Sequence, residues 1–148
     1  MGDRTTVYFT VAGKIGRDDL STLIEAMAAE GFRSNDDDAE PCADNLDETF
    51  YASEVNYANI DDLTAVCDRL GLDREHWWEA GGGYGAGIER CRGGECRERS
   101  ASEASPVFTL AEILDITEQL AGMANLVREA KWWSDPLGSL EIVETATV

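Results

Sequence analysis

Alternating hydrophobic and polar residues mark the start of the chain as a strand. Over 5–12, Val7, Phe9 and Val11 lie two positions apart, so their side chains share one face. The β-branched and aromatic residues of this stretch also favour strands. Short stretches of similar character, bounded by glycine or polar residues, predict further strands at 49–55, 88–92 and 139–143.

Apolar residues at helical spacing follow the first two expected strands. Leu20, Leu23 and Met27 lie on one side of a helix that we expect to begin at 18 or 19 and to end near 30. A helix with the same start, Asp-Asp-Leu, is expected over 61–70. A glycine follows each helix, as is common at C-terminal ends. The same strand, Asp-Asp-Leu helix start and closing glycine occur twice, which suggests a strand–helix unit repeated at an offset of 43 residues.

The third and longest expected helix covers 109–133. It begins with Thr109 and Glu112 at the spacing of a capping box, in which each side chain satisfies a backbone amide of the other. Its apolar side should be buried and is formed by Ile113, Leu114, Ile116, Leu120, Met123, Ala124 and Val127.

These elements predict one α+β domain over 1–148. We expect a two-layer sandwich, in which about three helices cover one face of a mostly antiparallel sheet of four or five strands. Duplication of a strand–helix unit is one origin for this arrangement. The sequence leaves open a homodimer, because pairing through a sheet edge or the long helix leaves no clear pattern.

The charge balance excludes several classes of protein. The chain carries 30 acidic and 12 basic residues, a net charge of −18. Phosphate is repelled by such a chain, so binding of nucleic acid through the acidic face is not expected. No apolar run approaches the roughly 20 residues of a membrane-spanning helix, and Met1-Gly2-Asp3-Arg4 does not resemble a signal peptide. We therefore expect a cytoplasmic protein without a membrane partner.

The acidic residues are concentrated between 36 and 79, where 14 acids and two arginines give a net charge of −12. Within this region, the segment 34–48 is expected to be an exposed loop, hereafter the acidic loop. Seven of its fifteen residues are acidic and none is basic: Asp36, Asp37, Asp38, Glu40, Asp44, Asp47 and Glu48. A field of one sign attracts basic partners. The alternative is adaptation to high salt, which the presence of only two lysines also fits.

Four cysteines limit the redox and metal chemistry. Cys67 fits the buried side of a helix, and Cys42 belongs to the polar loop. Cys91 and Cys96 flank a turn, so they could form a disulfide, supply two zinc ligands or remain thiols, the last being the default in a reducing compartment. A zinc site needs a second close pair of ligands, which the sequence lacks. We expect neither a metal nor another cofactor.

Other candidate residues lie near the glycine-rich run 81–87. This run lacks the lysine and hydroxyl residue of a phosphate loop, so we expect a flexible turn or a wide hairpin. The single histidine, His76, is expected to be partly exposed near the end of a helix, with a general base as the alternative. In each tryptophan pair, 77–78 and 132–133, one ring can face outward, and the alternative is that both rings pack at the rim of the core. Trp78 and Trp133 are therefore candidate anchors for a partner.

Four arginines share one ten-residue window, namely Arg90, Arg92, Arg97 and Arg99. They could form a local basic patch. Glu89, Glu95 and Glu98 lie among them, which favours mutual salt bridges instead.

Small size, strong acidity, few lysines and no catalytic motif together resemble inhibitors from phages and mobile elements, such as anti-CRISPR and anti-restriction proteins. The resemblance is compositional and rests on no motif. It implies a non-enzymatic protein whose carboxylates occupy a basic, nucleic-acid-binding groove in place of phosphates. The seven acids of the acidic loop, with Trp78 and Trp133, are the expected partner-binding residues, whereas Asp61 and Asp62 are expected to act as helix caps.

Two other functions remain open. A small enzyme or ligand-binding domain would use a pocket near His76, Trp77, Trp78 and the glycine-rich run. An immunity protein or antitoxin would use the same acidity against a basic nuclease.

Overall fold

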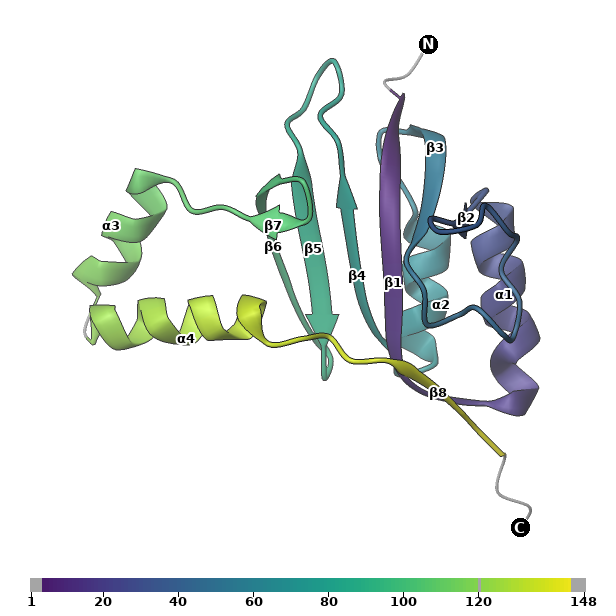
Figure 1. Cartoon of the computed structure of the whole chain (residues 1–148). Coiled ribbons are helices and arrows are strands. Elements are labelled where there is room, and N and C mark those ends of the chain that lie inside the picture. Colours follow the sequence, from purple (N-terminus) through teal and green to yellow (C-terminus); the bar gives the residue numbers. More distant parts are fainter. Residues whose placement is uncertain (1–3, 120, 145–148) are drawn as a thin grey trace.

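The computed structural model describes residues 4–119 and 121–144, which form eight strands and four α-helices (Figure 1). The strands are β1 (Arg4–Gly16), β2 (Arg33–Ser34), β3 (Phe50–Asn56), β4 (Asp73–Trp78), β5 (Gly87–Arg92), β6 (Glu95–Ser102), β7 (Ser105–Pro106) and β8 (Leu140–Val143). The helices are α1 (Leu20–Ala29), α2 (Asp61–Arg69), α3 (Leu110–Glu118) and α4 (Gly122–Ser134), with a short 3-10 helix, Arg17–Asp19, before α1.

The strands form one sheet in the order β2-β3-β1-β4-β5-β6-β7, with β8 beside the end of β1. Strands β3 and β4 flank β1 and are both antiparallel to it, so β3, α2 and β4 form a split β-α-β unit around β1. Only the β1–β8 pair is parallel among the pairings of the described strands. The expected α+β class with a mostly antiparallel sheet is confirmed.

The sheet is larger than expected. Residues 95–102, where no strand is expected from the sequence, form strand β6 and pair with all of β5. No residue of β6 is buried, because this strand lies near the sheet edge and beyond the helical layer. Alternation of polar with apolar side chains, the usual signal of a strand, is therefore absent from its sequence.

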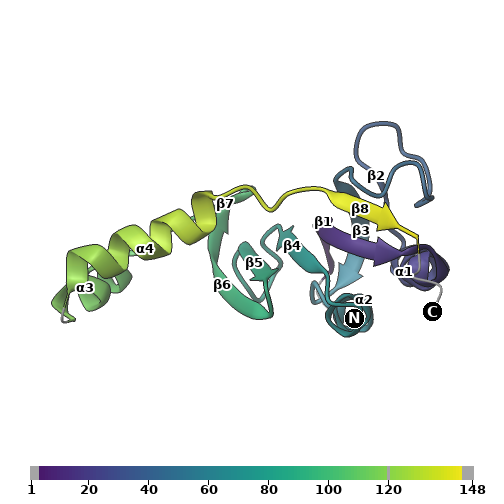
Figure 2. The ribbon, with the colours of Figure 1, turned by 90° about the horizontal axis from the view of Figure 1, so that it is seen from below.

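Helices α1 and α2 lie side by side on one face of the sheet (Figure 2). Between them and the sheet, Val7, Phe9 and Val11 of β1 are completely buried. Leu23 of α1 and Leu63 of α2 are buried in the same core, which follows from their helical spacing. The strand–helix units β1–α1 and β3–α2 are thus neighbours, and their origin by duplication stays a prediction.

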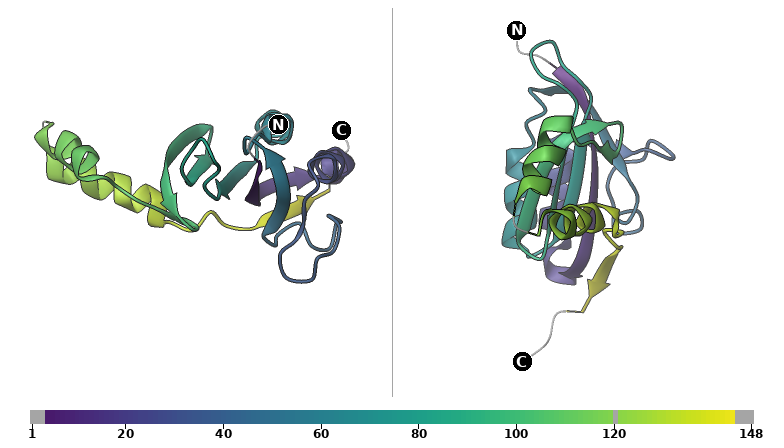
Figure 3. Two further views of the ribbon diagram at one scale, coloured as in Figure 1. Left: turned by 90° about the horizontal axis from the view of Figure 1, so that it is seen from above. Right: turned by 90° about the vertical axis from the view of Figure 1, so that its left-hand side faces the viewer.

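The expected helix over 109–133 is two helices. Helix α3 ends at Glu118, because Gln119 is extended with a ψ of 158°, and Ala121, with a φ of +62°, precedes α4, which packs against α3. The hairpin extends away from the sheet, as the view from above shows (Figure 3, left). Leu114 and Met123 are therefore 55% and 68% exposed, and their expected burial is wrong. Leu120, expected on the same side, lies outside the described residues.

The arginines of β5 and β6 hold this hairpin. Arg97 and Arg99 both form salt bridges with Glu129 of α4. Arg97 also lies 4.5 Å from the Trp132 ring centroid, within the range of a cation–π interaction. Among the three acids expected as partners, only Glu95 pairs with an arginine of the cluster, Arg97. Most of the pairing comes instead from acids of other elements, such as Glu129.

Candidate binding sites

The acidic loop connects β2 with β3 and is fastened at its base. Leu46 is buried in the main core, and Asn45 is buried beside it. The Asn45 side chain accepts a hydrogen bond from the Cys42 amide at 2.9 Å and donates one to the Glu40 carbonyl at 3.0 Å. The loop is therefore exposed at its acidic side chains but not unstructured at its base.

Six of the seven acids form no ion pair with any described residue, and five of these six also lack a hydrogen bond to another side chain. These five are all exposed: Asp36, Asp37, Glu40, Asp44 and Asp47. The remaining two are engaged. Asp38 accepts hydrogen bonds from Tyr51 and from Arg33, which lower the pKa of the Asp38 carboxyl, the Tyr51 bond most. Glu48 accepts a hydrogen bond from the buried Ser34.

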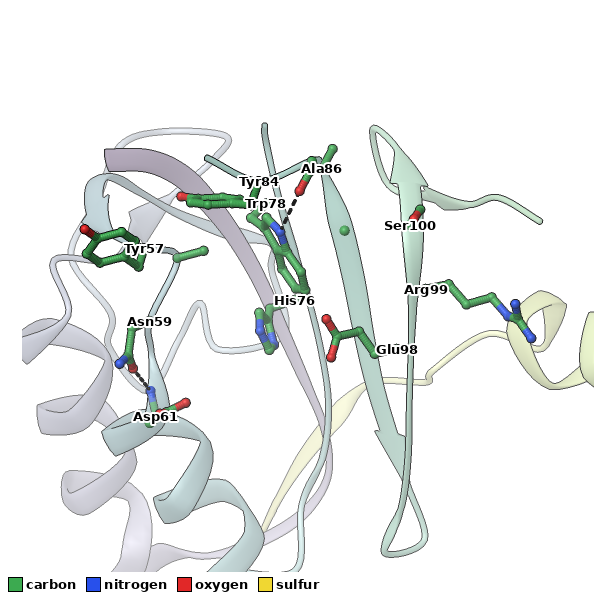
Figure 4. Close-up of a pocket in the computed structure, with 13 residues that line it drawn as sticks. Tyr57, Asn59, Asp61, His76, Trp78, Tyr84, Ala86, Glu98, Arg99 and Ser100 are labelled. Atoms are coloured by element: carbon green, nitrogen blue, oxygen red, sulfur yellow. Dashed lines mark hydrogen bonds between the residues drawn. The ribbon is translucent and has the colours of Figure 1, made fainter. Parts of the chain in front are cut away.

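A pocket of about 510 Å³ opens on the helix-bearing side of the sheet, beside the C-terminal end of β4 and the N-terminal end of β5 (Figure 4). Its wall combines β4, the glycine-rich run, β6 and the segment before α2. The residues used below are Tyr57, Asn59, Asp61, His76, Trp78 and Glu98. This volume falls within the range of small-molecule sites. We call it the His76 pocket.

His76 lies in the middle of β4, only 7% exposed, so its expected position at the exposed end of a helix is wrong. Burial removes water from the ring and lowers the pKa of His76 to about 4. The ring is neutral at pH 7. Its Nδ1 atom is buried without a hydrogen-bond partner among the described residues. Buried polar atoms are paired in the great majority of cases, so this atom marks a site that needs explanation.

Trp78 forms the aromatic floor of the pocket. Its ring lies 5.4 Å from that of His76, and its Nε1 donates a hydrogen bond to the Gly85 carbonyl at 3.2 Å. Gly87 allows this approach, since a Cβ there would lie 2.3 Å from the ring. The glycine-rich run is the β4–β5 connection, as expected, and two of its glycines position Trp78.

The charged groups at the pocket are carboxylates. Asp61 lies in the first turn of α2 and makes no side-chain capping bond, so its expected role as a cap is not seen. Its amide instead donates to the Asn59 side chain at 2.9 Å. Glu98 points from β6 toward His76, whereas the Arg99 side chain extends away from the pocket (Figure 4).

The second tryptophan pair is positioned differently from the expectation. Trp133 is 6% exposed and its Nε1 donates to Glu129 at 3.2 Å, so the expected outward ring is wrong. Trp132 packs edge-on against it, with centroids 4.9 Å apart. The Trp133 ring is therefore part of the buried packing of α4 and is not an exposed anchor for a partner.

Neither a metal cluster nor a membrane span is found in the described part of the chain. No group of three or more His, Cys, Asp or Glu side chains is close enough there to hold a metal ion. None of the described helices is both long and apolar enough to cross a bilayer. Cys91 and Cys96, directly opposite on β5 and β6, form a disulfide.

Comparison with protein-family models, with curated proteins and with solved structures finds no match to the chain. Its function is therefore argued from geometry and charge. Sequence reasoning named His76 and Trp78 as pocket residues, but it missed Tyr57, Asn59 and Glu98. Pairing of β4 with β5 and of β5 with β6 brings Glu98 near His76. Pairing of β1 with both β3 and β4 places the segment after β3, with Tyr57 and Asn59, on the other side. No local pattern could have identified these three residues.

Proposed function

We propose that the chain is a non-enzymatic acidic protein that inhibits a basic, nucleic-acid-binding partner in the cytoplasm. In this proposal the carboxylates of the acidic loop occupy the partner's phosphate-binding groove, as in the anti-restriction and anti-CRISPR class. The observation that carries it is the contrast between unpaired acids and engaged arginines. Five exposed loop acids have no ion-pair partner among the described residues, whereas Arg74, Arg90, Arg97 and Arg99 are all bound by acids of the chain itself.

This pairing removes basic groups from the surface and leaves the acidic field uncompensated. A second group of acids adds to the field between α1 and α2. Burial raises the pKa of Glu30, and the nearby charges of Asp61 and Asp62 raise it further. Such a field accelerates encounter with a basic surface and weakens as salt screens it.

The test is capture of partners from host lysate at low and moderate salt, followed by displacement of labelled duplex DNA from the purified partner. A variant that carries Asp36→Asn, Asp37→Asn, Glu40→Gln, Asp44→Asn and Asp47→Asn should fold normally and lose most of the inhibition. A matched variant changes five exposed acids elsewhere, namely Asp18→Asn, Asp19→Asn, Glu25→Gln, Asp115→Asn and Glu118→Gln, and should retain it.

Either of two results would overturn the proposal. The first is a captured partner that releases no DNA when the protein binds. The second is equal loss of inhibition in both variants, because that would show a dependence on net charge alone rather than on the acidic loop.

A further inference from the structure

We infer that the His76 pocket binds a small protonated amine that carries a flat or aliphatic apolar group. This binding site is separate from the acidic loop and does not rest on the proposed function.

The first step is the unpartnered nitrogen. His76 is more than nine-tenths buried, lines the pocket, and leaves Nδ1 without a partner among the described residues. A neutral imidazole carries its proton on one nitrogen and accepts a hydrogen bond at the other. An ammonium N–H is a donor that the accepting nitrogen can use.

The second step is the charge of the pocket. Asp61 and Glu98 contribute carboxylates to its wall. The one cationic residue of the wall, Arg99, directs its guanidinium to Glu112 and Glu129 instead. Arg74, on the same face as His76, is likewise held by Asp68 and Glu89. A cation is therefore favoured over an anion such as phosphate.

The third step is the aromatic surface. The Trp78 ring and the Tyr57 ring, the latter 60% exposed, face the pocket from different elements (Figure 4). Aromatic faces attract cations and also cover apolar groups. An amine with an apolar body fits the carboxylates, the neutral imidazole of His76 and these rings together.

The experiment uses the full chain and three probes of the same size and shape: phenethylamine, its neutral analogue 2-phenylethanol, and the anion phenylacetate. Binding is measured by tryptophan fluorescence and by titration in amide NMR spectra. We expect saturable binding of phenethylamine, with the shifted resonances confined to the pocket wall. The alcohol should bind at least about tenfold more weakly, and the anion should not bind.

Paired variants distinguish the pocket from general acidity. The double variant Asp61→Asn, Glu98→Gln should weaken phenethylamine binding by about tenfold or more. The matched variant Asp62→Asn, Glu118→Gln removes the same charge from exposed positions outside the pocket and should leave binding unchanged. The five-acid variant of the acidic loop should also bind normally, which separates this site from the proposed function.

Three results would overturn the inference. They are no saturable binding of phenethylamine at millimolar concentration, equal binding of all three probes, or equal weakening by the two double variants.

Discussion

Glu129 of α4 accepts hydrogen bonds from Nε and Nη2 of Arg99 in β6, at 3.2 and 2.9 Å. The same carboxylate binds Arg97 and the Trp133 indole, so one acid joins the helical hairpin to the edge of the sheet. Because the Glu129 and Arg99 side chains are mostly buried, loss of the acid would leave Arg97 and Arg99 with one acidic partner each, Glu95 and Glu112.

We therefore expect Glu129→Gln to lower the free energy of unfolding by on the order of 2–4 kcal/mol. Urea denaturation measures the loss, and hydrogen exchange should show faster opening of α3 and α4 than of β1. Glu118→Gln, an exposed change on the same hairpin, is the control. Equal effects of the two substitutions would contradict this account of the hairpin.

The turn of the hairpin depends on close contact at Gly122. A Cβ there would lie 2.0 Å from the Thr117 carbonyl oxygen, which is backbone and cannot move aside easily. Gly122→Ala should destabilise the protein by about 1–3 kcal/mol. Ala121→Gly should instead be neutral or stabilising, because Ala121 has a positive φ that glycine adopts without strain. Thermal unfolding measures both changes: the unfolding temperature should fall in Gly122→Ala and should stay the same or rise in Ala121→Gly.

His76 should make stability depend on pH. Its pKa falls from 6.5 to about 4 on folding, first because burial disfavours the charged ring; Arg74 lowers it further, while Glu89 and Asp61 oppose the shift. The unfolded chain therefore binds the proton at higher pH than the folded chain. The associated stability is complete above about pH 6.5 and is lost as pH falls toward 4, to a limit of about 3 kcal/mol.

Comparison with His76→Gln isolates this effect, because the carboxylates common to both chains cancel. The difference in unfolding free energy between wild type and variant should shrink or reverse from pH 6.5 to 4. A difference that stays constant over this interval would contradict a buried neutral histidine.

The cysteines should differ in reactivity. Burial raises the pKa of Cys67 to about 12, so this thiol should resist alkylation in the folded protein, whereas exposed Cys42 should react. Cys96 should react only after reduction of its bond to Cys91. Mass spectrometry of the alkylated protein measures this order, and labelling of Cys96 without a reductant would contradict it.

Reduction should cost stability without unfolding the protein. The Cys91–Cys96 bond closes a loop of only six residues, for which the chain-entropy estimate is about 2 kcal/mol. Six paired positions between β5 and β6 remain when the bond is broken. The double variant Cys91→Ser, Cys96→Ser should therefore show a lower unfolding temperature and an unchanged circular dichroism spectrum.

Local pattern was sufficient for β1, α1 and α2. Their buried side chains repeat at the spacing of a strand or a helix. These side chains form the core between the sheet and the two helices, so the apolar spacing in the sequence matches burial in the structure. The same approach predicted the capping box at Thr109 and Glu112, which is present. It failed for β6, where charged residues alternate on a strand with no buried position.

The chain's acidity, its α+β class and the exposure of the acidic side chains at the loop follow from the sequence by itself. Three features depended on tertiary structure: the break between α3 and α4, the pairing of Cys91 with Cys96, and the burial of His76. Each arises from contacts between residues brought together by strand pairing or by the return of a helix. Local periodicity indicates which face of an element is apolar, but it does not indicate which other element packs against that face.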